Sequence, residues 1–165
     1  MNYSLPRKDL FDYLIAIIPA CITAGVALIG YWQFRINKNK LRLDLYNKRF
    51  EIYTRTIDFY QILLGYDVAK SSENDLVHKN FIKACRESQF LFKKNSGIYE
   101  MLNEMHSKAF KIIGFKEHGK ELVDAPDVFM KQNQEMQDAL KWLMDIIPKL
   151  EEALAPYLDF HKITG

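Results

Sequence analysis

An uncharged run from Tyr13 to Phe34 is the feature that most restricts how this chain can fold. The run reads YLIAIIPACITAGVALIGYWQF, and about 20 apolar helical residues are enough to cross the roughly 30 Å hydrocarbon core of a bilayer. Tyr31 and Trp32 lie near one end of the run, where amphipathic rings favour the headgroup region. The sequence therefore predicts a transmembrane helix over residues 13–34. A buried helix of a soluble protein is the alternative that the composition leaves open.

Basic residues follow the uncharged run and do not precede it. Residues 1–12 carry a net charge of 0 and residues 35–50 a net charge of +5, whereas a secretory signal peptide has its positive charge before an apolar core of about 7–15 residues. Lys and Arg near a membrane helix favour the cytoplasmic side. The sequence therefore predicts a single-pass bacterial inner-membrane protein with a short extracytoplasmic tail at residues 1–12 and a cytoplasmic domain at residues 35–165.

Six basic residues form the juxtamembrane segment that sets this orientation. They are Arg35, Lys38, Lys40, Arg42, Lys48 and Arg49. The simplest interpretation is a topology signal, and the alternative is that they also bind anionic lipid of the bilayer, which is worth about 1 kcal/mol per basic residue near the surface. Residues 51–165 carry a net charge of −3. That charge disfavours duplex nucleic acid as a partner, because a nucleic-acid surface needs basic residues spread over the folded domain.

Apolar residues at alternating steps of three and four predict helices through the rest of the chain. The first such stripe predicts a helix that runs from the membrane to about residue 69. Its seven positions are Leu43, Tyr46, Phe50, Tyr53, Ile57, Tyr60 and Leu64. A second helix is expected over residues 75–94. In the third helix, the expected buried positions are Ile98, Leu102, Met105, Ala109 and Ile112.

Glycine and proline set the expected ends of the last two helices. Gly114 is expected to end the third helix in the left-handed conformation, residues 115–125 are expected to form a surface loop, and Pro126 suits the first turn of a fourth helix. The sequence thus predicts an all-α protein, with one N-terminal transmembrane helix followed by a cytoplasmic antiparallel bundle of about four helices. The first bundle helix could be continuous with the membrane helix.

Small residues recur on one face of the predicted membrane helix. They are Ala16, Ala20, Thr23, Ala24, Ala27 and Gly30. Close packing through small residues is a usual way for membrane helices to associate, since lipid provides no hydrophobic force between them. This face predicts a homo-oligomer, and the alternative is the ordinary abundance of Ala and Gly in membrane helices.

Lysines gather around the second and third predicted helices and the loop after them. They are Lys93, Lys94, Lys108, Lys111, Lys116 and Lys120. Such lysines could bind an anionic ligand, for example a nucleotide messenger, in one or two patches. The competing interpretation is that lysines near helix C-termini complement the helix dipole and keep the surface soluble.

Motifs for catalysis, cofactors or metals are not evident. The sequence has no P-loop, no G-x-G-x-x-G after a strand and no G-x-S-x-G elbow. Its four histidines include His78 and His106, and none forms an i, i+4 pair with another. Asp75 and His78 could place two ligands on one helix face, but a metal site in a bundle needs more such contributions. No catalytic, cofactor-binding or metal-binding residue is therefore predicted.

Two segments resemble a widespread group of small, uncharacterised bacterial single-pass membrane proteins. KLRLDLYNKRFEIY at residues 40–53 matches a K-L-R-L-D-L-F/Y-x-K-R-F/Y pattern, and SQFLFKKNSGIYEMLNEMHSKA at residues 88–109 matches a later F-L-F segment. The resemblance implies an inner-membrane anchor with a cytoplasmic helical domain and carries no catalytic residues. In the first segment, Asp44 could pair with Lys48 on a solvated helix face, or the charged residues could form a docking face for a cytoplasmic partner protein.

These features predict a membrane-anchored, non-enzymatic helical sensing or interaction module that self-associates. Two alternatives remain. The first is an effector of a bacterial defence or toxin system, antiviral defence among them, whose clustered membrane helices perturb or open the bilayer after a cytoplasmic trigger. The second is a membrane-bound enzyme of unspecified type.

Overall fold

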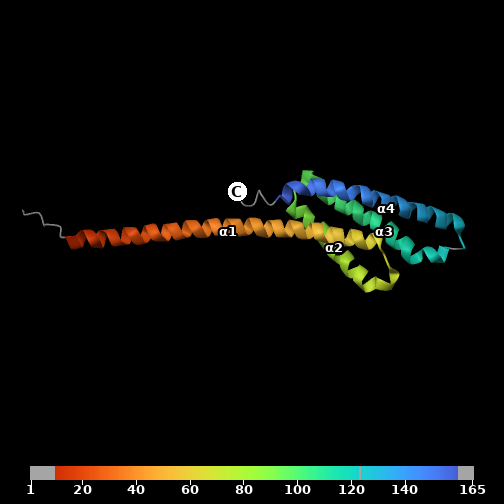
Figure 1. Cartoon of the computed structure of the whole chain (residues 1–165), viewed down its shortest axis with the longest axis horizontal. Helices are drawn as coiled ribbons and strands as arrows, with labels where there is room; N and C mark the ends of the chain where they lie inside the picture. Colours follow the sequence, from red (N-terminus) through yellow and green to blue (C-terminus); the bar gives the residue numbers. More distant parts are fainter. Residues whose placement is uncertain (1–9, 123, 160–165) are drawn as a thin grey trace, which may run out of the picture. The chain divides into compact units, whose positions relative to one another are not determined.

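A computed structural model describes residues 10–122 and 124–159, and every regular element in these ranges is helical (Figure 1). The α-helices are α1 (Leu10–Leu64), α2 (Ser71–Leu91), α3 (Ile98–His118) and α4 (Pro126–Leu154). Short 3-10 turns follow them as η1 (Val68–Lys70), η2 (Lys94–Ser96), η3 (Gly119–Leu122) and η4 (Ala155–Tyr157). The prediction of an all-α chain is confirmed for the described residues. Most of the predicted tail at residues 1–12 lies outside them.

The chain divides into two compact units. Unit 1 is Met1–Arg42 and unit 2 is Leu43–Gly165. The helix α1 contributes residues to both, so its first part belongs to unit 1 and its last part, from Leu43, belongs to unit 2.

In unit 1, α1 is long and apolar enough to cross a membrane by length and composition, with a mean hydropathy of 1.5 and no burial of its apolar stretch within the chain. Pro19 lies inside this helix. A helical proline lacks the N–H that would bond the carbonyl four residues earlier. The carbonyl of Pro19 accepts a hydrogen bond from the Thr23 hydroxyl, with an oxygen–oxygen distance of 2.8 Å. The Thr23 hydroxyl is therefore satisfied within its own helix.

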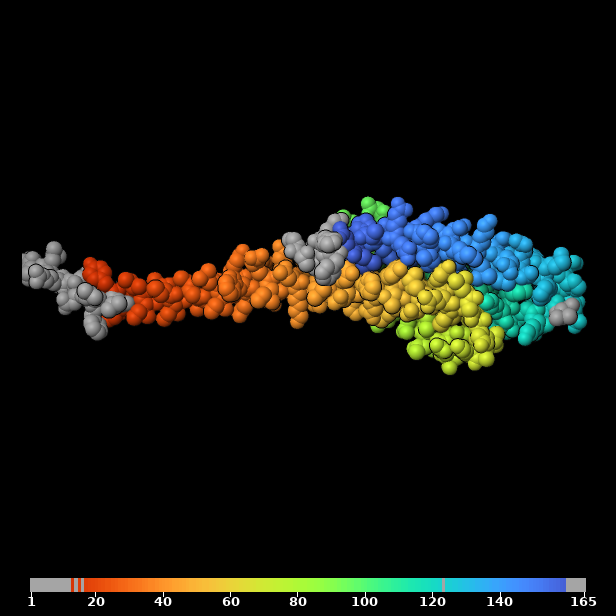
Figure 2. Space-filling model, in the orientation of Figure 1, coloured from red at the N-terminus to blue at the C-terminus, as the bar shows by residue number. Residues whose placement is uncertain are grey.

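Unit 2 is built around α3. The five apolar positions predicted for this helix are all buried, and α3 packs against both α2 and α4. The rings of Phe59 and Phe81 stack at 4.3 Å between centroids and join α1 to α2. The helices α1 and α4 are joined by a hydrogen bond from the Tyr53 hydroxyl to the Glu151 carboxylate at 2.8 Å. The part of α1 in unit 2 and α4 lie side by side in the space-filling view (Figure 2).

The predicted core stripe of α1 is wrong by one position. The buried residues are Ile52, Thr56, Phe59 and Leu63. Of the predicted stripe, Leu43, Phe50 and Leu64 are exposed, while Tyr53 and Tyr60 are half-buried at the edge of the core. One residue is about 100° of helix rotation. The sequence pattern missed this face because Thr56 counts as polar, but its hydroxyl donates to the Ile52 carbonyl at 2.8 Å and can therefore be buried.

Four predicted helix ends also differ from the structure. The helix α1 ends at Leu64 and not near residue 69, because the Asp67 side chain accepts a hydrogen bond from the Ala69 N–H at 2.9 Å and starts the turn η1. The helix α2 covers Ser71–Leu91 and not residues 75–94.

Gly114 does not end α3, which continues to His118, so most of the predicted loop at residues 115–125 is helical. A glycine inside a helix costs about 1 kcal/mol, and Phe115 holds the extra turn in place with its ring 5.3 Å from that of Phe129 in α4. The left-handed glycine among the described residues is Gly97, with φ of 71°, at the start of α3. The start of α4 at Pro126 is confirmed.

Candidate functional site

The described large apolar side chains of α1 in unit 1 are all exposed. They are between 54% and 70% exposed: Tyr13, Ile15, Ile17, Ile18, Ile22, Val26, Leu28, Ile29, Tyr31, Trp32, Phe34, Ile36 and Leu41. They lie all around the helix and not along one stripe. A helix that is apolar on every side requires an apolar environment on every side. This surface can therefore be covered by lipid, by copies of itself, or by both.

The small-residue face lies within this same surface. The side chains of Ala20, Thr23, Ala24 and Ala27 are exposed, and a side chain added at Gly30 would meet nothing within 4 Å. The side chain of Ala16 lies outside the described ones. Because the Thr23 hydroxyl donates its proton to the Pro19 carbonyl in its own helix, Thr23 can offer a neighbouring helix its methyl group and an acceptor oxygen but no donor.

The juxtamembrane basic residues differ in what they contact. Arg35, Lys38 and Lys40 are exposed in unit 1, whereas Arg42 is half-buried. Lys48 forms its ion pair with Glu51 at 3.2 Å, where the sequence predicts a pair with Asp44. The structure shows that Arg35, Lys38 and Lys40 have exposed side chains; whether they act as a topology signal or also bind lipid stays a prediction.

Arg49 belongs to the interior contacts of unit 2. Its Nε donates to the Leu91 carbonyl at 3.0 Å, and its guanidinium lies 5.0 Å from the ring centroid of Tyr157 and 5.9 Å from that of Phe92. Burial lowers the pKa of the Arg49 guanidinium. The sequence assigned this residue to the topology signal, to lipid or to a charged helix surface that could dock a partner, and no signal in the sequence indicated that it joins the start of unit 2 to the end of α2 and to η4.

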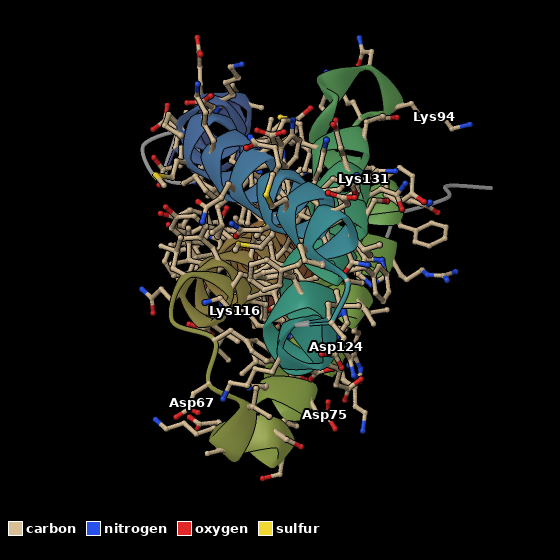
Figure 3. All side chains as sticks on the ribbon, turned by 90° about the vertical axis from the view of Figure 1, so that its right-hand side faces the viewer. Asp67, Asp75, Lys94, Lys116, Asp124 and Lys131 are labelled. Atoms are coloured by element: carbon tan, nitrogen blue, oxygen red, sulfur yellow. The ribbon has the colours of Figure 1, made fainter. Side chains whose placement is uncertain are left out.

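The six lysines do not converge on one site. Lys93 and Lys94 are exposed beside a cleft of about 500 Å³ at the turn before α3, and Lys116 lies in the last turn of α3 (Figure 3). The Lys116 ammonium donates to the Leu64 carbonyl at 3.4 Å, at the C-terminal end of α1. The two ends of α3 are about 30 Å apart, at a rise of about 1.5 Å per residue.

The lysines between these ends have protein partners. Lys108 lies 4.0 Å from Glu104 and 5.7 Å from the ring centroid of Trp142. Lys111 lies 3.2 Å from Glu135 on α4. Lys120 is exposed in η3. These contacts fit the interpretation of the lysines as surface and helix-end residues, and leave Lys93 and Lys94 as the pair most open to an anion.

A contact between His78 of α2 and His106 of α3 is the most distinctive polar feature of unit 2. Their Nε2 atoms are 3.2 Å apart, so one imidazole donates a hydrogen bond to the other. Burial lowers the pKa of the His78 and His106 imidazoles. His106 lowers the pKa of His78 further, and the negative charge of Asp75 raises it. The ring of Phe59 stacks on His78 at 5.0 Å, and Phe110 lies 4.9 Å from His106. Sequence reasoning missed this pair because the two residues are 28 positions apart.

A cleft of about 290 Å³ adjoins His78 between α1, α2 and α3. Its polar groups largely satisfy one another. The Tyr66 hydroxyl donates to Glu117, and burial together with that hydrogen bond raises the pKa of Tyr66 to about 12. The Asn74 amide donates to the Asp67 carbonyl at 2.9 Å. Asp67 and Asp75 both lie at this end of unit 2 (Figure 3).

Among residues 10–122 and 124–159, no group of three or more His, Cys, Asp or Glu side chains could hold a metal ion. The chain matches no protein-family model, no curated protein and no solved structure. Arg49 and Leu91 contact each other. Arg49 lies in residues 40–53 and Leu91 in residues 88–109, the two segments on which the sequence resemblance was based.

Proposed function

We propose that this protein is a membrane-anchored, non-enzymatic interaction or sensing module that self-associates. Residues 13–34 cross a bacterial inner membrane once, the N-terminus lies outside and unit 2 lies in the cytoplasm. The observation that carries this proposal is the exposure of every described large apolar side chain over that stretch of α1.

The exposed apolar surface supports membrane insertion on energetic grounds. Burial of one Val, Leu, Ile or Phe side chain is worth roughly 1.5–3 kcal/mol, and eight such side chains are exposed in this stretch: Ile15, Ile17, Ile18, Ile22, Val26, Leu28, Ile29 and Phe34. The hydrophobic core of unit 2 includes none of these side chains. Lipid supplies an apolar environment on all sides, which one protein groove would not.

The exposed basic residues support the orientation. Arg35, Lys38 and Lys40 directly follow the apolar stretch, and their side chains are exposed. Lys and Arg at that position favour retention on the cytoplasmic side. The neutral charge of residues 1–12 puts no comparable basic signal at the other end.

The small-residue face supports self-association within the membrane. Its exposed members allow two helix backbones to approach closely, and Gly30 leaves open space where a side chain would stand. Disulfide crosslinking of single cysteines at residues 20, 24 and 27, compared with residues 22, 26 and 29, would test this. A preference for the first set supports the proposal, and equal crosslinking of both sets contradicts it.

The orientation is tested by cysteine accessibility. In a background in which Cys21 and Cys85 are replaced by Ser, a membrane-impermeant maleimide should label Ser4→Cys in intact cells after the outer membrane is permeabilised. It should label Ser72→Cys, at the exposed start of α2, only after lysis. The reverse pattern would contradict the orientation, and labelling of both residues in intact cells would contradict a membrane-spanning chain.

A membrane-perturbing effector is the second candidate, because clustering through the same small-residue face would bring several apolar helices together. One observation weakens it. A water-filled pore needs a polar lining, and the Thr23 hydroxyl in the middle of the stretch is already bonded to Pro19. Induced expression with a membrane-potential dye distinguishes the two functions. Depolarisation that is lost on replacement of Ala24 and Ala27 by Leu supports the effector, whereas unchanged potential and growth support the interaction module.

A further inference from the structure

The distance between the Nε2 atoms of His78 and His106 is close to the spacing of two ligands on one metal ion. Zinc binds imidazole nitrogen at about 2.0–2.1 Å in tetrahedral geometry, which puts two ligand nitrogens about 3.3 Å apart by the same geometry. The Nε2 atoms of His78 and His106 are 3.2 Å apart. A hydrogen bond accounts for the same distance, so the two interpretations have to be separated by chemistry.

We propose that His78 and His106 bind one divalent ion of the zinc, nickel or copper class through their Nε2 atoms. Imidazole suits these ions, whereas magnesium and calcium prefer oxygen ligands. In the ion-free protein one ring carries its proton on Nε2 and donates it to the other; on binding, that ring takes up a proton at Nδ1 and releases the one at Nε2, so both neutral rings present an Nε2 lone pair to the ion. The site needs only residues of unit 2, and so it is independent of the membrane anchor.

The surroundings of the two imidazoles favour this role. Both pKa values are lowered, first by burial, and the neutral ring is the form that binds a metal. Phe59 stacks on His78 with an interplanar angle of 11°, and Phe110 packs beside His106 at 4.9 Å. These rings fix the orientations of the ligands before the ion arrives, which reduces the entropic cost of binding.

The site is open and joins two helices. The described part of the chain supplies no further His, Cys, Asp or Glu grouped with the pair, so water or a small anion completes the coordination. Both side chains are partly exposed, which gives the ion access. Since one ligand comes from α2 and the other from α3, the ion stabilises the folded state over the unfolded state.

The test is isothermal titration calorimetry of the full-length protein, which is purified without a polyhistidine tag and kept in detergent micelles. The starting variant is His118→Ala with His161→Ala, because it leaves His78 and His106 as the only histidines. ZnCl₂ should bind this variant with one ion per chain and raise its melting temperature, and MgCl₂ should do neither. No saturable zinc binding would overturn the proposal.

Two further variants in that background separate the metal site from a hydrogen bond. His78→Gln retains an amide that can hydrogen-bond to His106 and should fold without added metal, as measured by circular dichroism. Its zinc affinity should fall at least by the roughly 10–100-fold that accompanies loss of an outer-shell partner. His106→Gln should behave in the same way. Unchanged zinc affinity in either variant would show that the ion binds elsewhere and would overturn the proposal.

Discussion

The two units of this chain use apolar residues in opposite ways. In unit 1, large apolar side chains surround α1 and none of those described is buried, as Ile22 illustrates with 61% exposure. In unit 2, the same helix has one buried face, on which Ile52 is 1% exposed. Nothing in the character of isoleucine differs between these positions. The difference is whether polar residues occupy the other faces of the helix.

That difference indicates what each unit requires to be stable. Unit 2 buries its apolar residues by folding on itself, so its stability depends on packing within the chain. Unit 1 has no such core and depends on an apolar surrounding. Substitutions of the same chemical kind should therefore have different effects in the two units, and also on different faces of one helix.

The largest expected effect is in the core of unit 2. Phe59→Ala removes a fully buried ring that stacks on both Phe81 and His78, and such truncations cost about 3–5 kcal/mol. Phe50→Ala, on the predicted but exposed stripe of α1, should cost less than about 1 kcal/mol. Urea denaturation in detergent, followed by circular dichroism and Trp142 fluorescence, measures both. Equal losses would mean that the stripe through Phe50 is the buried one.

This pair of variants also marks how far the sequence predicts unit 2. Helical spacing identified the α3 core correctly, because all five of its positions are apolar and all five are buried. In α1, two adjacent apolar faces exist, and the more regular one is not the buried one. The choice between them depends on Thr56, whose hydrogen bond to its own helix is not visible in a pattern of apolar residues.

A lysine in the apolar stretch of α1 should have the next largest effect. Ile22→Lys places a charge in the middle of the proposed span, where insertion costs about 2.5–3.5 kcal/mol. Leu76→Lys in α2 is the matched control, since Leu76 is 60% exposed and Ile22 is 61% exposed. Alkaline carbonate extraction of membranes should release much of the first variant and leave the second in the membrane. Retention of both would indicate that residue 22 does not lie in the hydrocarbon core, and release of both would indicate that this stretch does not span the membrane.

Arg49 should show a smaller effect that separates two roles. Arg49→Lys retains the positive charge that a topology signal requires, but loses the fork that donates to Leu91 while it lies over Tyr157. A hydrogen bond from a charged group is worth about 1.5–3 kcal/mol, and we expect a loss near the lower value. Lys48→Ala, which removes a surface ion pair with Glu51, should cost no more than about 1 kcal/mol. The urea midpoints of the Arg49→Lys and Lys48→Ala variants measure both effects. An unchanged midpoint for Arg49→Lys would mean that Arg49 contributes through its positive charge and not through the contacts of its guanidinium.

Arg49 and the histidine pair show why the site could not be predicted as the core was. The core follows from local periodicity, which a sequence displays directly. The contact of Arg49 with Leu91 joins residues 42 positions apart, and that of His78 with His106 joins residues 28 positions apart. Neither contact follows a repeat or a motif. Each depends on the angles at which packed helices meet, and these are set by the whole core.

The smallest expected effect is the pH dependence of unit 2 without added metal. Because the folded-state pKa values of His78 and His106 are lowered, the unfolded chain binds more protons than the folded chain as the pH falls below about 6.5. The stability contributed by the neutral pair is therefore present above that pH and is lost on acidification. The positive charge of Arg86 also lowers the pKa of His106, whereas the negative charge of Asp75 raises the pKa of His78.

Urea midpoints at pH 7.5 and pH 5.5 measure this dependence. The wild-type midpoint should fall more than that of His78→Gln, in which one titrating member of the pair is absent. His118→Gln is the control, since His118 is exposed at the end of α3 and lies 3.5 Å from Glu121. The midpoint of this variant should fall by as much as that of the wild type. A fall of equal size in His78→Gln would assign the acid sensitivity to carboxylates instead. The comparison between the units would then sharpen, because acid would act on unit 2 through its surface charges while its aromatic and histidine interior stayed neutral.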